Sequence, residues 1–324
     1  MNKMRLILSI PLAVIVIAVV AFFWMNSHPG AVIPPTDGLH SPQNSVYYWR
    51  TVYDPSDGEK DFISRNGVGR MYLRMFDVTA DNGAVRPEAT VQFAAKPLKG
   101  VEIVPTVFIT VDALRQTDNI DALASRIVER VRRICQWNGV GEWHELQLDC
   151  DWTTTTRDRF YQLCRMVKGR LGHKLLSSTI RLHQLRQSAP PVDYGVLMVY
   201  NTDDFTNPHA TNSILNDSTV EKYVSQPLRF RLPLDIALPI YRWNLIYSKN
   251  GKFKRIAAEG DWGNDSTETA KYESVPYEVL TRTQHILNEY LHLDAARHST
   301  VLYHLDDNNI NNYSHEEFES LYRN

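Results

Sequence analysis

Two aspartates spaced two residues apart are the sharpest chemical feature of this 324-residue sequence. Asp149 and Asp151 lie at the end of a strand candidate, residues 144–151. In a β-strand alternate side chains share a face, so both carboxylates would point one way while Leu148 and Cys150 point the other. Like charges this close raise one pKa, which suits acid–base chemistry. The alternative is a structural carboxylate network. We favour that network for the deeper Asp149 and a role in the site for Asp151, which lies nearer the end of the strand. Both are candidate catalytic residues.

The pattern of apolar runs indicates the scaffold that positions these carboxylates. Residues 120–137 carry Leu123, Ile127, Val131 and Ile134 at helical spacing, and other helical stretches alternate with strand candidates. Such alternation indicates βαβ units and favours a (β/α)8 TIM barrel over a doubly wound sheet. No GxGxxG follows the first strand, which weakens a dinucleotide-binding alternative. The expected strands are 46–49, 68–76, 101–109, 144–151, 175–182, 194–200, 234–241 and 300–305.

The N-terminus predicts a membrane helix before the barrel. Lys3 and Arg5 precede an uncharged apolar run, residues 6–24, which is long enough to nearly span a ~30 Å hydrocarbon core. Its bulky end favours an uncleaved signal anchor over residues 1–25, which would leave the barrel outside the cytoplasm, periplasmic or extracellular. If the run is instead a cleaved signal peptide, the protein is secreted. Membrane contact through this helix is therefore one expected partnership.

The rest of the chain divides simply. Residues 26–43 are rich in Pro and Gly and predict an extended linker, and residues 44–324 form the barrel domain. A polar stretch at about 248–275 reads as an insertion near the barrel mouth. Residues 314–323 predict a closing helix, with Ser314 as N-cap and Glu317 as its capping-box partner.

Composition and cysteine usage narrow the classes of function. Net charge is −2, so nothing draws the chain toward nucleic acid, and we expect no nucleic-acid partner. The three cysteines, Cys135, Cys150 and Cys164, have neither metal-ligand nor CxxC spacing. No P-loop, GxSxG or HExxH motif is present. We therefore expect no cofactor and no metal.

Several motifs together resemble the family 18 glycoside hydrolases, the chitinase-like barrels. Residues 149–152 (Asp-Cys-Asp-Trp) resemble the later part of that family's fourth-strand motif, D-G-x-D-x-D-W-E. Residues 198–201 resemble its sixth-strand M-x-Y-[DN], and residues 238–241 resemble its seventh-strand G-x-P-x-Y. Tyr303 lies where the family has a tryptophan on the last strand. The resemblance implies a barrel that engages carbohydrate, a polysaccharide or oligosaccharide.

The departures from the family pattern bear directly on catalysis. Thr153 occupies the position of the family's catalytic glutamate, and Leu146 replaces its first aspartate. In that family the substrate's N-acetyl group is the nucleophile and the glutamate protonates the leaving oxygen, which a threonine hydroxyl cannot do. We expect a divergent glycoside hydrolase-like protein that acts on or binds a cell-envelope or extracellular polysaccharide. The alternative is a non-catalytic glycan-binding or envelope scaffold protein, a pseudoenzyme.

Residues at strand ends complete the candidate site. Aromatic rings stack on sugar rings, so the aromatics at predicted strand ends are candidates for substrate binding. Arg50 and Arg74 could pair with the two aspartates or contact an anionic ligand. Aspartates that follow strands could supply an acid for catalysis, or they could only cap helices and form turns. The candidate substrate-binding residues are Trp49, Trp152, Tyr200, Asn201, Tyr241 and Asp306. The other strand-end aspartates are Asp77, Asp203, Asp204 and Asp307.

Overall fold

The computed structural model describes residues 33, 34, 36, 38–226, 228, 230–257, 267–293 and 297–323. The membrane helix expected over residues 1–25 lies outside these residues. Within them, no helix combines the length and the apolar character that crossing a bilayer requires.

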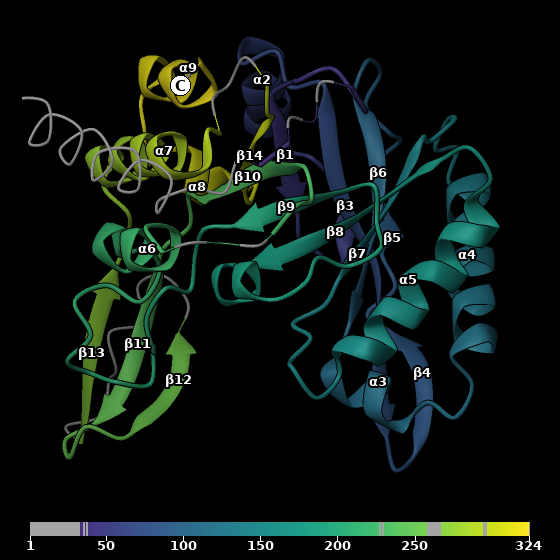
Figure 1. The fold of residues 1–324 in the computed structure, drawn as a ribbon. Helices are drawn as coiled ribbons and strands as arrows, with labels where there is room; N and C mark the ends of the chain where they lie inside the picture. The colour runs from purple at the N-terminus through teal and green to yellow at the C-terminus, as the bar shows by residue number, and fades with distance from the viewer. Residues whose placement is uncertain are drawn as a thin grey trace, which may run out of the picture.

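Eight parallel strands of the described chain close into a barrel (Figure 1). Each strand pairs with its neighbours in the order β1-β14-β10-β9-β8-β7-β6-β3, and β1 also pairs with β3, which closes the sheet. The TIM-barrel prediction is therefore confirmed. The strands are β1 (Ser45–Tyr48), β3 (Arg70–Asp81), β6 (Glu102–Ile109), β7 (Glu145–Asp149), β8 (Leu175–Arg181), β9 (Tyr194–Met198), β10 (Leu234–Pro239) and β14 (Thr300–Tyr303).

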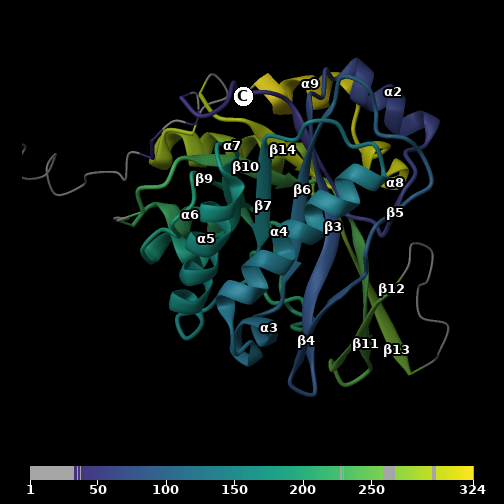
Figure 2. The ribbon, with the colours of Figure 1, turned by 90° about the vertical axis from the view of Figure 1, so that its right-hand side faces the viewer.

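The strand β3 is longer than its sequence pattern indicates. The apolar run ends at Phe76, but the strand continues to Asp81 because β4 (Ala84–Glu88) folds back and pairs antiparallel with residues 77–81. This hairpin extends from the same end of the barrel as a three-stranded sheet described below (Figure 2). Residues 77–81 are held in the strand by pairing with β4 rather than by burial of apolar side chains. The apolar pattern of the sequence therefore ends before the strand does.

Side chains alternate between a polar barrel interior and an apolar outer layer. On β7, Leu146 and Leu148 join the large apolar cluster that packs under the helices. Glu145 and Gln147 face inward, where Glu145 accepts hydrogen bonds from Ser177 and from the Tyr194 hydroxyl. Gln147 accepts a hydrogen bond of 2.8 Å from the Tyr47 hydroxyl. The expected two-residue alternation of this strand is therefore confirmed. The inward polar groups are hydrogen-bonded because an unpaired polar group is costly to bury.

Helices cover most of the outer surface of the barrel. The expected apolar stripe of α4 is buried against the sheet, and its N-cap Asn119 accepts a hydrogen bond from the Ala122 amide. The strands β3 and β6 are joined without a helix, as are β8 and β9, which a short turn of 3-10 helix η1 (Leu182–Arg186) connects. The helices are α2 (Asp57–Arg65), α3 (Val111–Gln116), α4 (Ile120–Trp137), α5 (Arg157–Leu171), α6 (Asp217–Val224), α7 (Tyr277–Leu291), α8 (Asp307–Ile310) and α9 (His315–Arg323).

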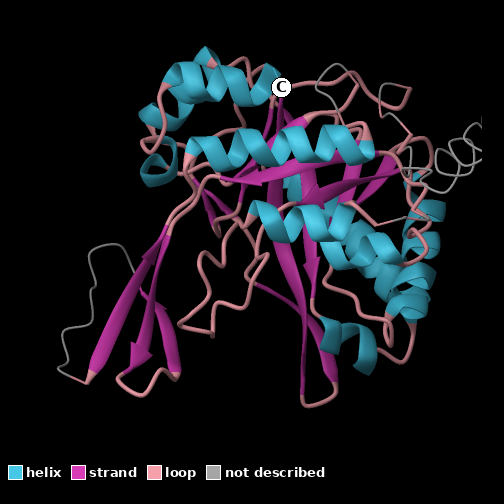
Figure 3. Cartoon of the chain, turned by 60° about the vertical axis from the view of Figure 1, so that its left-hand side comes forward, coloured by secondary structure: helices cyan, strands magenta, loops and turns pink. Residues whose placement is uncertain are grey.

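The expected insertion forms a small antiparallel sheet that stands away from the barrel (Figure 3). Its strands are β11 (Trp243–Ser248), β12 (Phe253–Ala257) and β13 (Glu268–Glu273), with β11 in the centre. The closing helix α9 begins as expected: Glu317 and Ser314 exchange backbone–side-chain hydrogen bonds in a capping box.

The end of the expected linker is part of the folded unit. Ile33 and Thr36 are buried, and the Thr36 hydroxyl donates a 2.9 Å hydrogen bond to Asp235 at the start of β10. His40 lies 3.2 Å from the other oxygen of Asp235 and also contacts Arg70. These contacts close the barrel end opposite the mouth. The folded domain therefore begins before residue 44, where the linker was expected to end. The reason is that the buried carboxylate of Asp235 takes its partners, Thr36 and His40, from the preceding segment.

Candidate functional site

A pocket of about 390 Å³ opens where the carboxyl ends of the barrel strands meet. In barrels of this kind the loops at this end form the functional site. Both candidate aspartates line the pocket, and five of the other lining residues are Trp or Tyr. The lining residues are Trp49, Arg74, Phe108, Asp149, Asp151, Arg181, Tyr200, Asn201, Tyr241, Trp243, Tyr303 and His304.

Arg181 binds the two candidate aspartates together. It ends β8, next to β7, and its Nε donates to a carboxylate oxygen of Asp151 while Nη2 lies 4.0 Å from Asp149. Asp149 also accepts a 2.6 Å hydrogen bond from the Thr179 hydroxyl. The guanidinium lies over the ring of Tyr200, 5.4 Å from its centre. The deeper carboxylate is thus held as a structural network would hold it, while half-exposed Asp151 faces the pocket.

Burial sets the protonation of Asp149. Desolvation raises its pKa from 3.8 to about 6, although Arg181 and the Thr179 hydroxyl lower it and the charge of Asp151 adds to the rise. A group with this pKa changes protonation near neutral pH. Burial also lowers the pKa of His304, so this ring is neutral at pH 7.

We expect the stability of the protein to fall with rising pH because of Asp149. Its folded-state pKa, about 6, lies above the ordinary 3.8, so its protonated form stabilises the fold below pH 3.8 and this contribution is lost as pH rises to 6. Relative to Asp149→Asn, the wild-type free energy of unfolding should drop by about 3 kcal/mol between pH 3.5 and 8. Urea unfolding across this range measures it. The exposed Asp158→Asn should show no such drift, and a flat difference for Asp149→Asn would contradict the prediction.

The other arginines expected near the aspartates have different partners. Arg74 donates a 2.8 Å hydrogen bond to Asp77, and its guanidinium lies 5.6 Å from the centre of the Trp49 ring. Arg50 binds Glu59 at 2.6 Å and lies 3.7 Å from Asp306. The expectation that Arg50 or Arg74 pairs with Asp149 or Asp151 is therefore wrong, because nearer carboxylates neutralise both.

Aromatic rings form one wall of the pocket. Tyr200 and Tyr303 lie with ring centres 4.7 Å apart, and Tyr241 packs edge-on against both. The Tyr241 hydroxyl donates a 2.8 Å hydrogen bond to Asn201, whose backbone adopts φ 53°, a region that asparagine tolerates. Trp49 completes the wall, 6.1 Å from Tyr303. The structure thus brings together Trp49, Tyr200, Asn201 and Tyr241.

Trp152 does not share this position, and its assignment to substrate binding is corrected. Its side chain has no exposed area and packs between Phe160 and Tyr161 of α5, with ring centres 6.2 and 5.4 Å away. The residue follows the strand end, but the chain has already turned outward there. Position next to Asp151 in the sequence was therefore a misleading signal.

Asp306 lies beside the pocket rather than in it. Its carboxylate caps α8 by accepting a 3.0 Å hydrogen bond from the Asn308 amide. It lines a neighbouring hollow of about 340 Å³ that shares Tyr241, Trp243 and His304 with the main pocket. A third hollow, about 300 Å³, shares Asp151, Arg181, Tyr200 and Asn201 with it. We call these three adjoining hollows the mouth groove.

The remaining aspartates at strand ends serve local structure. Asp204 accepts bonds from the Thr206 amide and hydroxyl, and Asp203 contacts Asn216 at 3.2 Å. Asp307 accepts a 2.8 Å hydrogen bond from Ser56, the N-cap of α2. None of the three lines the mouth groove's main pocket. These three aspartates therefore lie in turns and at helix starts, as the second interpretation of the strand-end aspartates expects.

Sequence reasoning missed Arg181, the residue on which both aspartates depend. A charged residue at the last position of an otherwise uncharged strand is the available signal, similar to the strand-end position that identified Asp151. Trp243 and Tyr303 also line the pocket, although neither is among the predicted substrate-binding residues. Among the described residues, no group of three or more His, Cys, Asp or Glu side chains is arranged to hold a metal ion.

Known structures define the class of this fold. The chain has the chitinase-like (β/α)8 barrel of the Bacillus cereus spore cortex-lytic enzyme SleL, with a TM-score of 0.54 and 11% identity over 88% of this chain and 75% of that one. A chitinase from Bacteroides thetaiotaomicron gives 0.55 and 10% over 87% and 96% of the two chains. A Trichuris suis chitinase gives 0.55 and 9% over 87% and 99%.

At such low identity these similarities establish the fold and nothing further. No protein-family model and no curated protein matches the sequence. The fold implied by the family 18 resemblance is confirmed, whereas the replacement of the catalytic glutamate by Thr153 stays a prediction.

Proposed function

We propose that this protein binds an oligosaccharide segment of an extracytoplasmic polysaccharide in the mouth groove. The observation that carries the proposal is the wall in which Trp49, Tyr241 and Tyr303 surround the buried Tyr200, because the partly exposed rings offer flat faces with polar tips for sugar rings and their hydroxyls. Three adjoining hollows suit an elongated ligand better than a single small molecule. The apolar N-terminal run would tether the barrel outside the cytoplasm.

The charges in the groove favour a neutral ligand. Each arginine that lines the main pocket is neutralised by an aspartate: Arg181 by Asp151 and Arg74 by Asp77. The paired groups still have lone pairs and N–H groups for sugar hydroxyls. Chitinases and a cortex-lytic enzyme share the fold, which supports polysaccharide as the ligand class.

The absence of a suitable acid favours binding over hydrolysis by the family route. Thr153 is exposed, its hydroxyl contacts Thr155 at 2.9 Å, and it does not line the main pocket. The carboxylates that do line it, Asp149 and Asp151, come from one strand and share one arginine. Among the residues that the structure describes, no carboxylate from another strand lines this pocket.

Binding can be measured by titrating the protein with chitin oligosaccharides and with β-glucan oligosaccharides in a calorimeter. Trp49→Ala and Tyr241→Ala should each weaken binding about tenfold or more, because stacking contacts contribute ~1–3 kcal/mol. Trp137→Ala is the matched control, since this tryptophan is 77% exposed on the outside of the barrel. No binding of either glycan class, or equal losses in all three variants, would overturn the proposal.

Hydrolysis is a second candidate because the pKa of Asp149, about 6, suits a general acid, and Asp151 could serve as its charged partner. Reducing-end release from the same oligosaccharides tests it. Asp149→Asn and Asp151→Asn should each abolish turnover while binding persists. Turnover that survives both substitutions would exclude this pair as the catalytic groups.

A further inference from the structure

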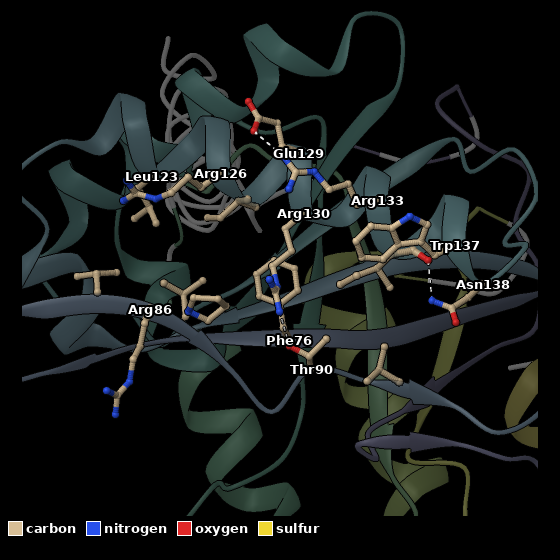
Figure 4. Close-up of a pocket in the computed structure, with 16 residues that line it drawn as sticks. Phe76, Arg86, Thr90, Leu123, Arg126, Glu129, Arg130, Arg133, Trp137 and Asn138 are labelled. Atoms are coloured by element: carbon tan, nitrogen blue, oxygen red, sulfur yellow. Dashed lines mark hydrogen bonds and ion pairs between the residues drawn. The ribbon is translucent and has the colours of Figure 1, made fainter.

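A second concave surface lies on the outside of the barrel, away from the mouth groove. A helix usually follows every strand of such a barrel. Between β3 and β6, however, residues 82–101 are all described and none is helical; the chain runs through β4 and the short β5 (Gln92–Phe93) instead. A hollow of about 380 Å³ remains between β4 and α4 (Figure 4), which we call the outer groove.

The outer groove has an apolar floor. Side chains from β3, from the segment after β4 and from α4 form it, and the ring of Phe76 lies under the guanidinium of Arg130 at 5.2 Å. The indole of Trp137 is 77% exposed at the end of the helix. A large exposed aromatic beside an apolar floor is typical of protein interaction sites. The apolar floor residues, each largely buried by its own core contacts so that Trp137 supplies the main exposed apolar area, are Phe76, Val78, Val91, Leu123, Ile127 and Ile134.

Arginines dominate the rim. Arg126, Arg130 and Arg133 follow one another along α4 at spacings of four and three, so they share one face of the helix. Arg86 lines the opposite side from β4, and the single carboxylate of the lining, Glu129, already contacts Arg133 at 3.6 Å. The groove therefore carries a clear excess of positive charge.

The arginine charges are unequally satisfied. Arg86 pairs with Asp81 and Glu88, and Arg130 donates a 2.7 Å hydrogen bond to the Thr90 hydroxyl. Arg126 has neither a hydrogen bond nor an ion pair with any residue that the structure describes. The Arg126 guanidinium is exposed, so it is free to pair with a negatively charged group of a partner.

We propose that the outer groove binds an acidic amphipathic helix of a partner protein. Such a helix would occupy the place of the barrel's missing helix, with apolar residues on the floor and Glu or Asp residues facing Arg126 and Arg133. From Arg126 to Trp137 the helix α4 rises about 16 Å, so a partner segment of about three turns spans the groove. Its carboxylates would need the same spacing of three and four residues.

Two nearer occupants match this chemistry less well. The chain's own residues 1–36 contain no Asp or Glu, so they cannot neutralise the rim. The acidic helix α9 of a second copy would have to expose Phe318 and Leu321, which are buried in their own barrel. Charge and burial therefore favour a different protein as the partner.

The proposal can be tested with the full chain in phosphatidylcholine nanodiscs and a fluorescein-labelled 15-residue helical peptide of Leu, Ala and Glu. Fluorescence anisotropy should show saturable binding that is absent with empty nanodiscs and at least tenfold weaker for the peptide with Lys in place of Glu. Arg126→Glu combined with Arg133→Glu should weaken binding at least tenfold. Arg132→Glu combined with Arg165→Glu, an equal charge change on exposed residues outside the groove, should leave it unchanged.

Three results would overturn the proposal. The first is equal binding of the acidic and basic peptides. The second is an equal loss in both double variants, which would show attraction by net charge rather than by the groove. The third is a dimer in light scattering that Arg126→Glu with Arg133→Glu dissociates, which would make a second copy the occupant. Trp137→Ala separates this site from the mouth groove, since it should weaken peptide binding and leave glycan binding unchanged.

Discussion

Replacing Arg181 by methionine should lower the free energy of unfolding by about 3 kcal/mol at pH 8. The substitution keeps much of the side-chain volume but leaves Asp149 buried without its counter-charge. The loss should be smaller at pH 5, where the carboxyl of Asp149 is protonated and needs no counter-charge. Urea unfolding at the two pH values measures both effects, and glycan binding should be lost with the arrangement of Asp151 and Tyr200.

Two further substitutions make this result specific. Arg181→Lys keeps the positive charge and should restore part of the stability, though not the two-sided contact that a guanidinium allows. Arg186→Met removes an exposed arginine one turn along, whose guanidinium lies over Tyr223, and should change the free energy of unfolding by less than about 1 kcal/mol. A loss at Arg181 no greater than at Arg186 would show that the aspartates do not depend on it.

Removing residues 33–43 should destabilise the barrel by about 4 kcal/mol, a combination of the buried Ile33 side chain and the contacts of Thr36 and His40 with Asp235. The measurement compares urea unfolding of two shortened chains, one that begins at residue 33 and one that begins at residue 44. Both lack the apolar N-terminal run, so the difference isolates this segment.

The same comparison has an internal check. In the longer chain, Thr36→Val removes the hydroxyl that donates to Asp235 and should account for about 1 kcal/mol of the difference. In the shorter chain Thr36 is already gone. Equal stability of the two shortened chains would mean that the barrel domain begins at residue 44 after all.

The strands were predictable because each carries apolar residues on the face that packs under the helices. All eight expected strands are present, and the two-residue alternation of β7 places Asp149 on the inner side, while Asp151, two residues beyond the strand, lines the same pocket. The extension of β3 was not predictable, since its polar end is held by β4 rather than by burial. The closing contacts of Thr36 and His40 were hidden for a similar reason: a Pro- and Gly-rich stretch shows no periodicity even where single residues are buried.

The sequence allowed a prediction of which residues lie at the barrel mouth, but not of which ion pairs they form there. Strand-end position found Asp151, Tyr200 and Tyr241, because barrel geometry brings all strand ends to one mouth. It failed for Trp152, whose ring turns outward just after the strand end. Of the two roles considered for Arg50 and Arg74, pairing with Asp149 or Asp151 does not occur, because they pair with Glu59 and Asp77. Ion pairs depend on distances of a few ångströms between distant residues, which spacing along one chain does not encode.

The hydrogen-bonded interior of the barrel has a consequence for how its sequence can change over time. Tyr47 bonds to Gln147, Gln147 to Ser177, and Ser177 to Glu145, which also binds Tyr194. Losing any one of these groups leaves another unsatisfied where water does not reach it. Substitutions inside this barrel should therefore be tolerated in compensating sets rather than singly, and these positions should vary together among homologues.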